Sequence, residues 1–323
     1  MKKLTTRLLS LVLLGAFIPS FALAQEWDLN NGNIIVNAVP GTEQTVSQAG
    51  STPTVDNNPV ITSNGNSTSN TVTITAAENA TANVTLENVN INTGGAAIST
   101  SGQGNVNIEL DGTNTVQSGT NHAGVEKKDN GTLTITDENK NGSLTANGGQ
   151  WAAGIGGGEN GNGSRITIEG GTVTANGGKC GAGIGGGSND NNVENIGKGE
   201  DIIIKDGTVT ATGGDGAAGI GGGFAGAGSD ITVSGGKVTA TGGEDGAGIG
   251  SGFNAGSNGA TNIKIEGDDV TATGGENGAG IGGGYNSSAN NIEVSKGTVQ
   301  ATGGKNGAGI GGGGDGGFGE HIT

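Results

Sequence analysis

Short runs of alternating apolar and polar residues recur along most of the chain. In Val173-Thr174-Ala175, for example, two apolar residues flank a polar one, which is the two-residue period of a β-strand with one buried face. Gly-Gly pairs separate the runs, and glycine readily adopts the backbone angles that sharp corners need. Because no run has a helical period, the pattern predicts an all-β protein made of short strands.

The tetrapeptide Ala-Gly-Ile-Gly sets the period of an internal repeat. Its copies are spaced by 29, 36, 29, 32 and 29 residues. They begin at Ala153, Ala182, Ala218, Ala247, Ala279 and Ala308. Two other strand-like segments precede each copy, such as residues 201–204 and 208–212 before Ala218, and less regular versions extend upstream. The repeat therefore supplies eight complete triplets of strands from about residue 84 to residue 311.

Strands this short cannot pair within one repeat, so each must pair with its equivalent in the next repeat. The expected fold is a right-handed parallel β-helix (a β-solenoid) with three short strands per coil and about eight complete coils. Alternation turns Val173, Ala175, Ala153 and Ile155 inward and the alternate glycines of the third strand outward. With strands about 4.8 Å apart, eight coils make a rod about 40 Å long.

The remaining segments complete the expected domain plan. Residues 1–24 have the basic start, short apolar run and Ala-Leu-Ala ending of a signal peptide, which predicts a secreted or cell-surface protein. Residues 25–70 are expected to form an irregular N-terminal capping segment, 71–141 degenerate coils, and 142–323 the glycine-rich repeats. Residues 321–323 match the start of another first strand, so we expect the sequence to be a fragment of a longer protein.

Charge excludes some classes of partner. Removal of the signal peptide takes away three of the 14 basic residues and none of the 30 acidic ones, so the mature balance is 11 − 30 = −19. Nucleic acid and anionic lipid are therefore poor partners on electrostatic grounds. No other segment is apolar enough to cross a bilayer, so we expect no membrane insertion of the mature chain.

The repeat Gly-Gly-Thr-Val-Thr-Ala-Thr-Gly-Gly-x-x-Gly-Ala-Gly-Ile-Gly-Gly-Gly resembles those of bacterial extracellular right-handed parallel β-helix proteins. These are described as pectate-lyase-like, carbohydrate-binding or adhesin-type repeat proteins. The resemblance covers roughly residues 84–323 and is more specific for the fold than for an activity. It implies a polysaccharide or host glycan as partner and, in some of these proteins, bound calcium.

Enzymes of this architecture carry chemistry that the sequence lacks in recognisable form. The lyases combine an acidic calcium cluster with a basic residue that abstracts a proton, and the glycosidases use grouped carboxylates. Here Asp268-Asp269 occupies a variable turn, Arg165 and Lys264 fall on different coils, and the two histidines, His122 and His321, are far apart. We therefore expect no enzyme in this sequence.

Outward threonines form two rows on the second strand of each repeat. Threonine is a good outward residue of any strand, which explains the rows without a ligand. A regular array of hydroxyl and methyl groups also suits ordered water, as in ice-binding solenoids, or sugar hydroxyls. The candidate array consists of Thr174, Thr210, Thr212, Thr239, Thr241, Thr271 and Thr273.

Three of the few aromatic residues occupy equivalent positions. Phe224, Phe253 and Tyr285 each follow the third-strand isoleucine by four residues, and Trp151 lies at a neighbouring corner. We expect the three rings to stack on consecutive coils. They are the best candidate ligand surface, because aromatic faces are apolar platforms suited to sugar rings. The alternative is that they pack on one another and hold the loops in place.

Acidic residues gather at the corner between the second and third strands. Asp215, Glu244, Asp245 and Glu276 would lie close together in a stack of coils, and a calcium ion would relieve their repulsion. No calcium-loop signature accompanies them, so solvated turns are the alternative.

The leading hypothesis is a secreted or cell-surface rod that binds polysaccharide or glycan, or acts as an adhesin. A structural stalk whose function lies elsewhere in a longer chain is the alternative. A polysaccharide lyase-like enzyme and an ice-binding protein are further alternatives.

Overall fold

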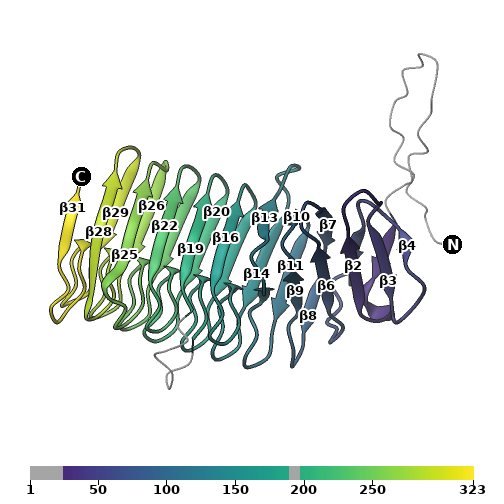
Figure 1. Ribbon diagram of the computed structural model, residues 1–323, viewed down its shortest axis with the longest axis horizontal. Coiled ribbons are helices and arrows are strands. Elements are labelled where there is room, and N and C mark those ends of the chain that lie inside the picture. Colours follow the sequence, from purple (N-terminus) through teal and green to yellow (C-terminus); the bar gives the residue numbers. More distant parts are fainter. Residues whose placement is uncertain (1–24, 189–196) are drawn as a thin grey trace, which may run out of the picture.

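The computed structural model describes residues 25–188 and 197–323, and their strands pair with equivalents in the neighbouring coils. The predicted signal peptide, residues 1–24, lies outside the described residues. Three sheets form a right-handed parallel β-helix of about nine turns, which appears in Figure 1 as an elongated stack of coils. The predicted fold class is confirmed.

Within the described residues the first sheet has 11 strands, all parallel, and its outer face carries a polar groove described below. In sheet order its strands are β1 (Glu26–Asp28), β5 (Val60–Thr62), β7 (Thr81–Glu87), β10 (Asn105–Asp111), β13 (Thr132–Thr136), β16 (Gly163–Ile168), β19 (Gly199–Ile204), β22 (Gly228–Val233), β25 (Gly256–Ile265), β28 (Ser287–Val294) and β31 (Gly319–Ile322).

The second sheet has eight parallel strands, most of them five residues long. In chain order these are β8 (Asn90–Asn92), β11 (Thr113–Gln117), β14 (Ser143–Asn147), β17 (Thr172–Asn176), β20 (Thr208–Thr212), β23 (Lys237–Thr241), β26 (Asp269–Thr273) and β29 (Thr298–Thr302).

The third sheet has 12 strands and closes the coil. It contains β2 (Ile34–Ala38), β3 (Thr45–Gln48), β4 (Thr54–Val55), β6 (Val72–Ala76), β9 (Ile98–Ser101), β12 (Val125–Lys127), β15 (Ile155–Gly156), β18 (Ile184–Gly185), β21 (Ile220–Gly221), β24 (Ile249–Gly250), β27 (Ile281–Gly282) and β30 (Ile310–Gly311). From β15 onward each is only two residues long, which is shorter than the sequence indicated.

The core contains the residues that alternation turned inward. Val173 pairs in register with Val209 and Ala175 with Ala211, and all four are fully buried. Isoleucines of the first and third strands, such as Ile166 and Ile155, complete the filling of each coil. Each apolar column is continuous because neighbouring coils pair residue for residue, so the core is built one coil at a time.

The third-strand glycines do not face solvent, contrary to the expectation. Gly185 and Gly221 are buried and have φ angles of 137° and 133°. A Cβ atom on Gly221 would lie 1.9 Å from the carbonyl oxygen of Gly250 in the next coil. Glycine is required here because the backbones of successive coils approach too closely for any side chain.

Residues 25–70 are more regular than the sequence indicated. β1 and β5 extend the first sheet, and β2 pairs in parallel with β6 of the third sheet. β3 and β4 then add in antiparallel order at the end of that sheet, and a single 3₁₀ turn, Leu29–Asn31, follows β1. The solenoid therefore begins well before residue 71, and only the β3–β4 ribbon has a geometry distinct from the coils.

Among the described residues, no helix is long and apolar enough to span a membrane.

Candidate functional site

The three aromatic rings stack as expected. The ring centroids of Phe224 and Phe253 lie 4.9 Å apart with planes inclined by 26°, and those of Phe253 and Tyr285 lie 5.6 Å apart and almost parallel. Each ring is partly exposed, and the Tyr285 hydroxyl donates a hydrogen bond of 2.8 Å to Asp315 Oδ2, which raises the pKa of Tyr285. We call Phe224, Phe253 and Tyr285 the aromatic column.

Stacking changes what the aromatic column can bind. Both faces of Phe253 are occupied by neighbouring rings, and the inner faces of Phe224 and Tyr285 are occupied by Phe253. A sugar ring binds to an aromatic face rather than to its edge. The column therefore offers mainly ring edges to solvent, and its geometry fits the alternative in which the rings pack on one another.

Backbone contacts fix the column on its turns. The amide of Phe224 donates to Cys180 O, that of Phe253 to Gly216 O and that of Tyr285 to Asp245 O. Gly216 has a φ of 71°, and a Cβ there would lie 2.6 Å from the Phe224 ring. Trp151 is separate from the column, because the ammonium of Lys179 lies 5.5 Å from its ring centroid instead.

The threonine array is present and in register on the second sheet. Thr174 pairs with Thr210, which in turn pairs with Thr239 and through it with Thr271. The second row runs from Thr212 through Thr241 to Thr273, and Gln300 follows Thr271 in the first row. All of these side chains point outward, as strand alternation requires, whether or not they bind a ligand.

The four acidic corner residues lie on the turns between strands of the second and third sheets. In the part of the chain that the structure describes, no three His, Cys, Asp or Glu side chains lie close enough together to hold a metal ion. Asp245 instead accepts a hydrogen bond of 2.7 Å from the Asn277 amide, which accepts one from Asn306. Asp245 is therefore engaged by an amide group, and Asp215, Glu244, Asp245 and Glu276 stay a candidate calcium site with solvated turns as the alternative.

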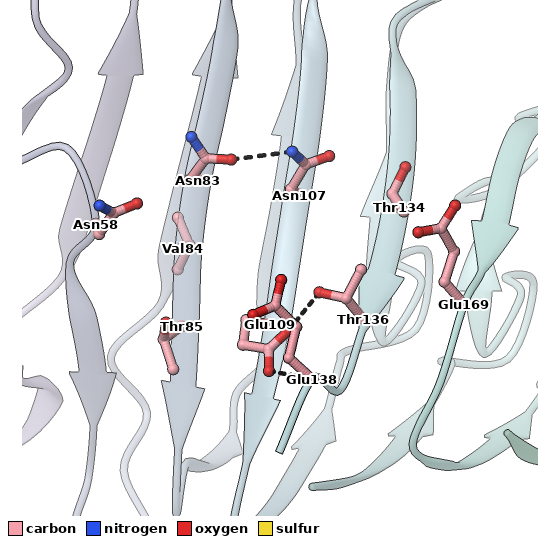
Figure 2. Close-up of a pocket in the computed structure, with 10 residues that line it drawn as sticks. All are labelled: Asn58, Asn83, Val84, Thr85, Asn107, Glu109, Thr134, Thr136, Glu138 and Glu169. Carbon is pink, nitrogen blue, oxygen red and sulfur yellow. Dashed lines mark hydrogen bonds between the residues drawn. The ribbon is translucent and has the colours of Figure 1, made fainter. Parts of the chain in front are cut away.

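A polar groove of about 350 Å³ lies on the outer face of the first sheet. Figure 2 shows its side chains, which come from successive strands of this sheet and from neighbouring turns. They are Asn58, Asn83, Val84, Thr85, Asn107, Glu109, Thr134, Thr136, Glu138 and Glu169. We call this hollow the first-sheet groove.

Hydrogen bonds order the side chains of the groove. Asn107 Nδ2 donates to Asn83 Oδ1 over 2.9 Å, and Thr136 Oγ1 donates to Glu109 Oε2 over 2.5 Å, as Figure 2 shows. Glu109 Oε1 also accepts from the backbone amide of Glu138. Amide, hydroxyl and carboxylate groups are therefore held at fixed positions along a surface with strands about 4.8 Å apart.

A second cavity, of about 440 Å³, lies where the chain passes from β12 toward β13 and from β15 toward β16. It is lined by Asn121, His122, Glu126, Lys127, Lys128, Asp129, Asn130, Gly158, Glu159, Gly161, Asn162 and Ser164. We call it the corner cavity. The repeat pattern does not reveal this cavity, because the coil of His122, Glu126 and Lys127 lacks the Ala-Gly-Ile-Gly motif.

Glu126 is the centre of the ionic contacts in the corner cavity. Its carboxylate is buried, and Oε2 lies 2.7 Å from His122 Nδ1 and accepts a hydrogen bond from the amide of Ala123. Oε1 lies 3.3 Å from the ammonium of Lys128. Both carboxylate oxygens are therefore engaged, and the His122 ring is held in one orientation.

Lys127 is buried beside this pair. Burial and, to a smaller extent, the nearby guanidinium of Arg165 together lower the pKa of Lys127 to about 8, although the carboxylate of Asp129 opposes the shift. The ammonium donates a hydrogen bond to the carbonyl oxygen of Asp129, and Arg165 Nη1 donates one of 2.8 Å to Asn130 O. The structure thus brings Arg165 close to the basic residues of another coil, which the sequence did not reveal.

Comparison with known proteins supports the repeat architecture. Six segments match a family model described as a beta helix repeat, namely residues 140–159, 166–188, 202–224, 231–253, 263–285 and 292–314. Each of the six includes one strand of the second and one of the third sheet and ends at the position of the aromatic column or its equivalent. Searches of curated proteins and of solved structures each gave no match.

Proposed function

We propose that this parallel β-helix protein is a secreted or cell-surface rod that binds polysaccharide along the outer face of its first sheet. The first-sheet groove carries the proposal, because several coils contribute ordered hydrogen-bonding groups to one open surface. Sugar hydroxyls both donate and accept hydrogen bonds, so they suit the mixed amides, hydroxyls and carboxylates of the groove.

An extended ligand fits the shape of this face. A further hollow of about 290 Å³ lies on the same sheet, lined among others by Asp230, Thr232, Asn262 and Lys264. The two hollows lie over different coils of one continuous sheet. A polymer that crosses the strands would meet a polar group at every coil of this outward row except that of Ile203, which favours an extended ligand over a single small molecule.

The charge of the groove favours an uncharged polysaccharide. Glu109, Glu138 and Glu169 line it, and within the described part of the chain only Glu169 of these three pairs with a lysine, Lys205, at 2.8 Å. A ligand rich in carboxylates or sulfates would be repelled by these groups, whereas neutral sugars can donate hydroxyl hydrogen bonds to them.

Binding to a glycan array and to insoluble polysaccharides tests the proposal. Asn107→Ala and Glu109→Gln should each weaken retention about tenfold, which corresponds to the loss of one or two hydrogen bonds to the ligand. Asn176→Ala is the matched control, because Asn176 makes an equivalent amide contact of 2.8 Å with Asn147 on the second sheet. If both groove variants bind like the wild type, the groove is not the binding surface.

The aromatic column gives a separate arm of the same experiment. The triple variant Phe224→Ala, Phe253→Ala and Tyr285→Ala should retain binding, because the ring faces are already covered by one another. Loss of binding by a triple variant that keeps its β-sheet circular dichroism would place the ligand on the column and contradict the groove proposal.

A structural stalk is the second candidate function. Ladders of equivalent side chains favour it, because the aromatic column and the amide contacts of Asn254 with Asn286 tie successive coils together. A wild-type protein that retains no polysaccharide on a broad panel would contradict the binding proposal and leave the stalk as the better account.

A further inference from the structure

Lys127 is a buried lysine at a position where the repeat needs no long side chain. It ends β12, where it pairs with Thr100 of β9, and its side chain is buried. The residues at the same position of the six later coils, two after the third-strand isoleucine, are all small. They are Gly157, Gly186, Gly222, Ser251, Gly283 and Gly312. Because burial of an amine costs desolvation energy, the architecture of the coil does not account for this lysine.

A backbone contact holds the Lys127 amine at the wall of the corner cavity. Its Nζ atom donates a hydrogen bond to the carbonyl oxygen of Asp129, and the side chain lines the cavity of about 440 Å³. A carbonyl oxygen only accepts hydrogen bonds, so it leaves the nitrogen lone pair free when the amine is neutral. The amine is therefore held in position and can act as a nucleophile once it has lost its proton.

The surroundings of Lys127 make that neutral form common near neutral pH. Burial, helped by Arg165 and opposed by Asp129, lowers the pKa of Lys127 to about 8. At pH 8 about half of these amines are neutral, compared with about one in 300 for a lysine with the ordinary pKa of 10.5. The charged and titratable side chains that line the cavity or act on this amine are His122, Glu126, Lys128, Asp129, Glu159 and Arg165.

The corner cavity has the size and polarity of a site for a small hydroxylated molecule. Pockets for small molecules have volumes of about 300–1,000 Å³, and this cavity lies within that range. Sugar hydroxyls both donate and accept hydrogen bonds, which suits its uncharged polar side chains. These belong to Asn121, Asn130, Asn162 and Ser164. Three carboxylates against two lysines in the lining disfavour an anionic ligand.

We infer that the corner cavity is a covalent carbonyl-binding site, in which Lys127 Nζ forms an imine with the aldehyde group of an uncharged hydroxyaldehyde, such as the open-chain reducing end of a sugar. The nitrogen bonds to the carbonyl carbon, both N–H protons pass to the carbonyl oxygen, and that oxygen leaves as one molecule of water. The reaction needs no oxidant or reductant and is reversed by hydrolysis. The site is independent of the first-sheet groove and of what that groove binds.

Reductive trapping in the wild-type protein tests the inference. Glyceraldehyde, an uncharged hydroxyaldehyde, is titrated at pH 7.5 with sodium cyanoborohydride, whose hydride reduces the imine to a stable secondary amine. Peptide mass spectrometry then gives the initial rate at each lysine. Lys127 should be modified at least tenfold faster than the exposed Lys296 and Lys305. Its rate should also saturate with glyceraldehyde concentration, because the cavity binds the aldehyde before the bond forms.

Lys127→Arg is the decisive variant, because the guanidinium keeps the positive charge and stays protonated, so it cannot form the imine. It should lose the fast and saturable modification, whereas Lys296→Arg should retain it. Glyoxylate, a small aldehyde that carries a carboxylate, tests the charge of the ligand. The ratio of the rate at Lys127 to that at Lys296 should be at least threefold lower with glyoxylate than with glyceraldehyde.

Three results would overturn the inference. One is modification of Lys127 no faster than that of Lys296 and Lys305, and another is a rate that stays proportional to glyceraldehyde concentration, which would show a reactive lysine without a binding site. The third is fast and saturable modification that persists in Lys127→Arg, because the reactive amine would then lie elsewhere. An equal ratio of rates with glyoxylate would contradict the preference for an uncharged ligand.

Discussion

Each residue of a coil has one equivalent in the coil before it and one in the coil after. A residue that differs from its equivalents therefore stands out against a background of stacked neighbours. Arg165 stands out among Asn, Asp and His residues, and Phe253 lies between two other rings. Such differences mark the positions at which substitution is most informative.

Lys127 predicts a pH dependence of stability. Its pKa in the folded protein is about 8, below the ordinary value of 10.5. Below pH 8 the lysine is charged in both the folded and the unfolded state, so the cost of its burial is fully present. Between about pH 8 and 10.5 the unfolded state holds a proton that the folded state has released, so the free energy of unfolding rises with pH.

Lys127→Met removes this titration and provides the comparison. The wild type should gain about 1–2 kcal/mol relative to the variant between pH 7 and pH 10, less than the full shift because the ammonium borders an open cavity. Urea unfolding in a series of buffers between pH 7 and pH 10 measures the difference. A constant difference across this range would contradict the burial of a charged ammonium.

The aromatic column predicts unequal effects of truncation. Phe253→Ala removes two ring contacts and Phe224→Ala removes one, and each contact is worth about 0.5–1.5 kcal/mol. Phe253→Ala should therefore lower the free energy of unfolding more than Phe224→Ala does. Chemical denaturation of both single variants and of the double variant also gives the coupling between the rings, and additive losses would argue against stacking.

At the residue scale, the sequence predicts the features that follow from the inward and outward alternation of side chains and from equivalent positions in successive repeats. The inward Val173 and Ala175, the threonine rows and the stacking of Phe224, Phe253 and Tyr285 all follow from a period of about 30 residues. The contact of His122 with Glu126 does not, because it lies in a coil without the Ala-Gly-Ile-Gly motif, and neither does the proximity of Lys127 to Arg165, which belongs to another coil. Only the course of the backbone brings those side chains together.

At the scale of single strands, the third sheet depends on close backbone contact rather than on side chains. Its later strands are two residues long, and their glycines have φ angles near 135°. The sequence indicated the strands correctly but not the burial of these glycines, because alternation describes a side chain's direction and a glycine has none. A side chain is excluded at these glycines by the short distance to the carbonyl group of the next coil.

Alanine substitutions at Gly221 and Gly311 distinguish backbone strain from steric clash, which are the two penalties of adding a methyl group at these positions. Their φ angles are 133° and 135°, so alanine suffers the same backbone strain at both. A Cβ at residue 221 would also lie 1.9 Å from Gly250 O, whereas the nearest atom at residue 311 is 3.5 Å away. Gly221→Ala should therefore be more destabilising than Gly311→Ala by at least about 2 kcal/mol.

Thermal unfolding followed by circular dichroism measures this difference. Equal melting temperatures for the two alanine variants would show that backbone strain alone, and not the approach of successive coils, accounts for the glycines.

At the scale of the whole molecule, the rod is a sum of nearly independent coils. The eight triplets expected between residues 84 and 311 are all present, because each carries its own strand pattern. The beginning of the solenoid was not recognised, because β1 and β5 lack the Gly-Gly and Ala-Gly-Ile-Gly signatures and pair by backbone hydrogen bonds. Parallel pairing needs no particular sequence once the neighbouring coil is in place.

Deletion of one coil tests this additivity. Removal of residues 231–262 joins Asp230 to Ile263, which pairs with Ile231 in the intact rod, so every stack can close again. The shortened protein should remain folded, with a length reduced by about 4.8 Å in small-angle X-ray scattering. Removal of only residues 231–246 leaves half a coil, disrupts all three sheets and should abolish cooperative unfolding.

The near identity of successive coils also has a consequence for inheritance. Where the codons for the repeated segments match, misaligned recombination between them would add or remove whole turns in frame. In every such product the strands of successive coils still pair, because the joined segments have the same neighbours as before. Length in this protein is therefore a trait that can change in steps within a population, without selection of a single new amino acid.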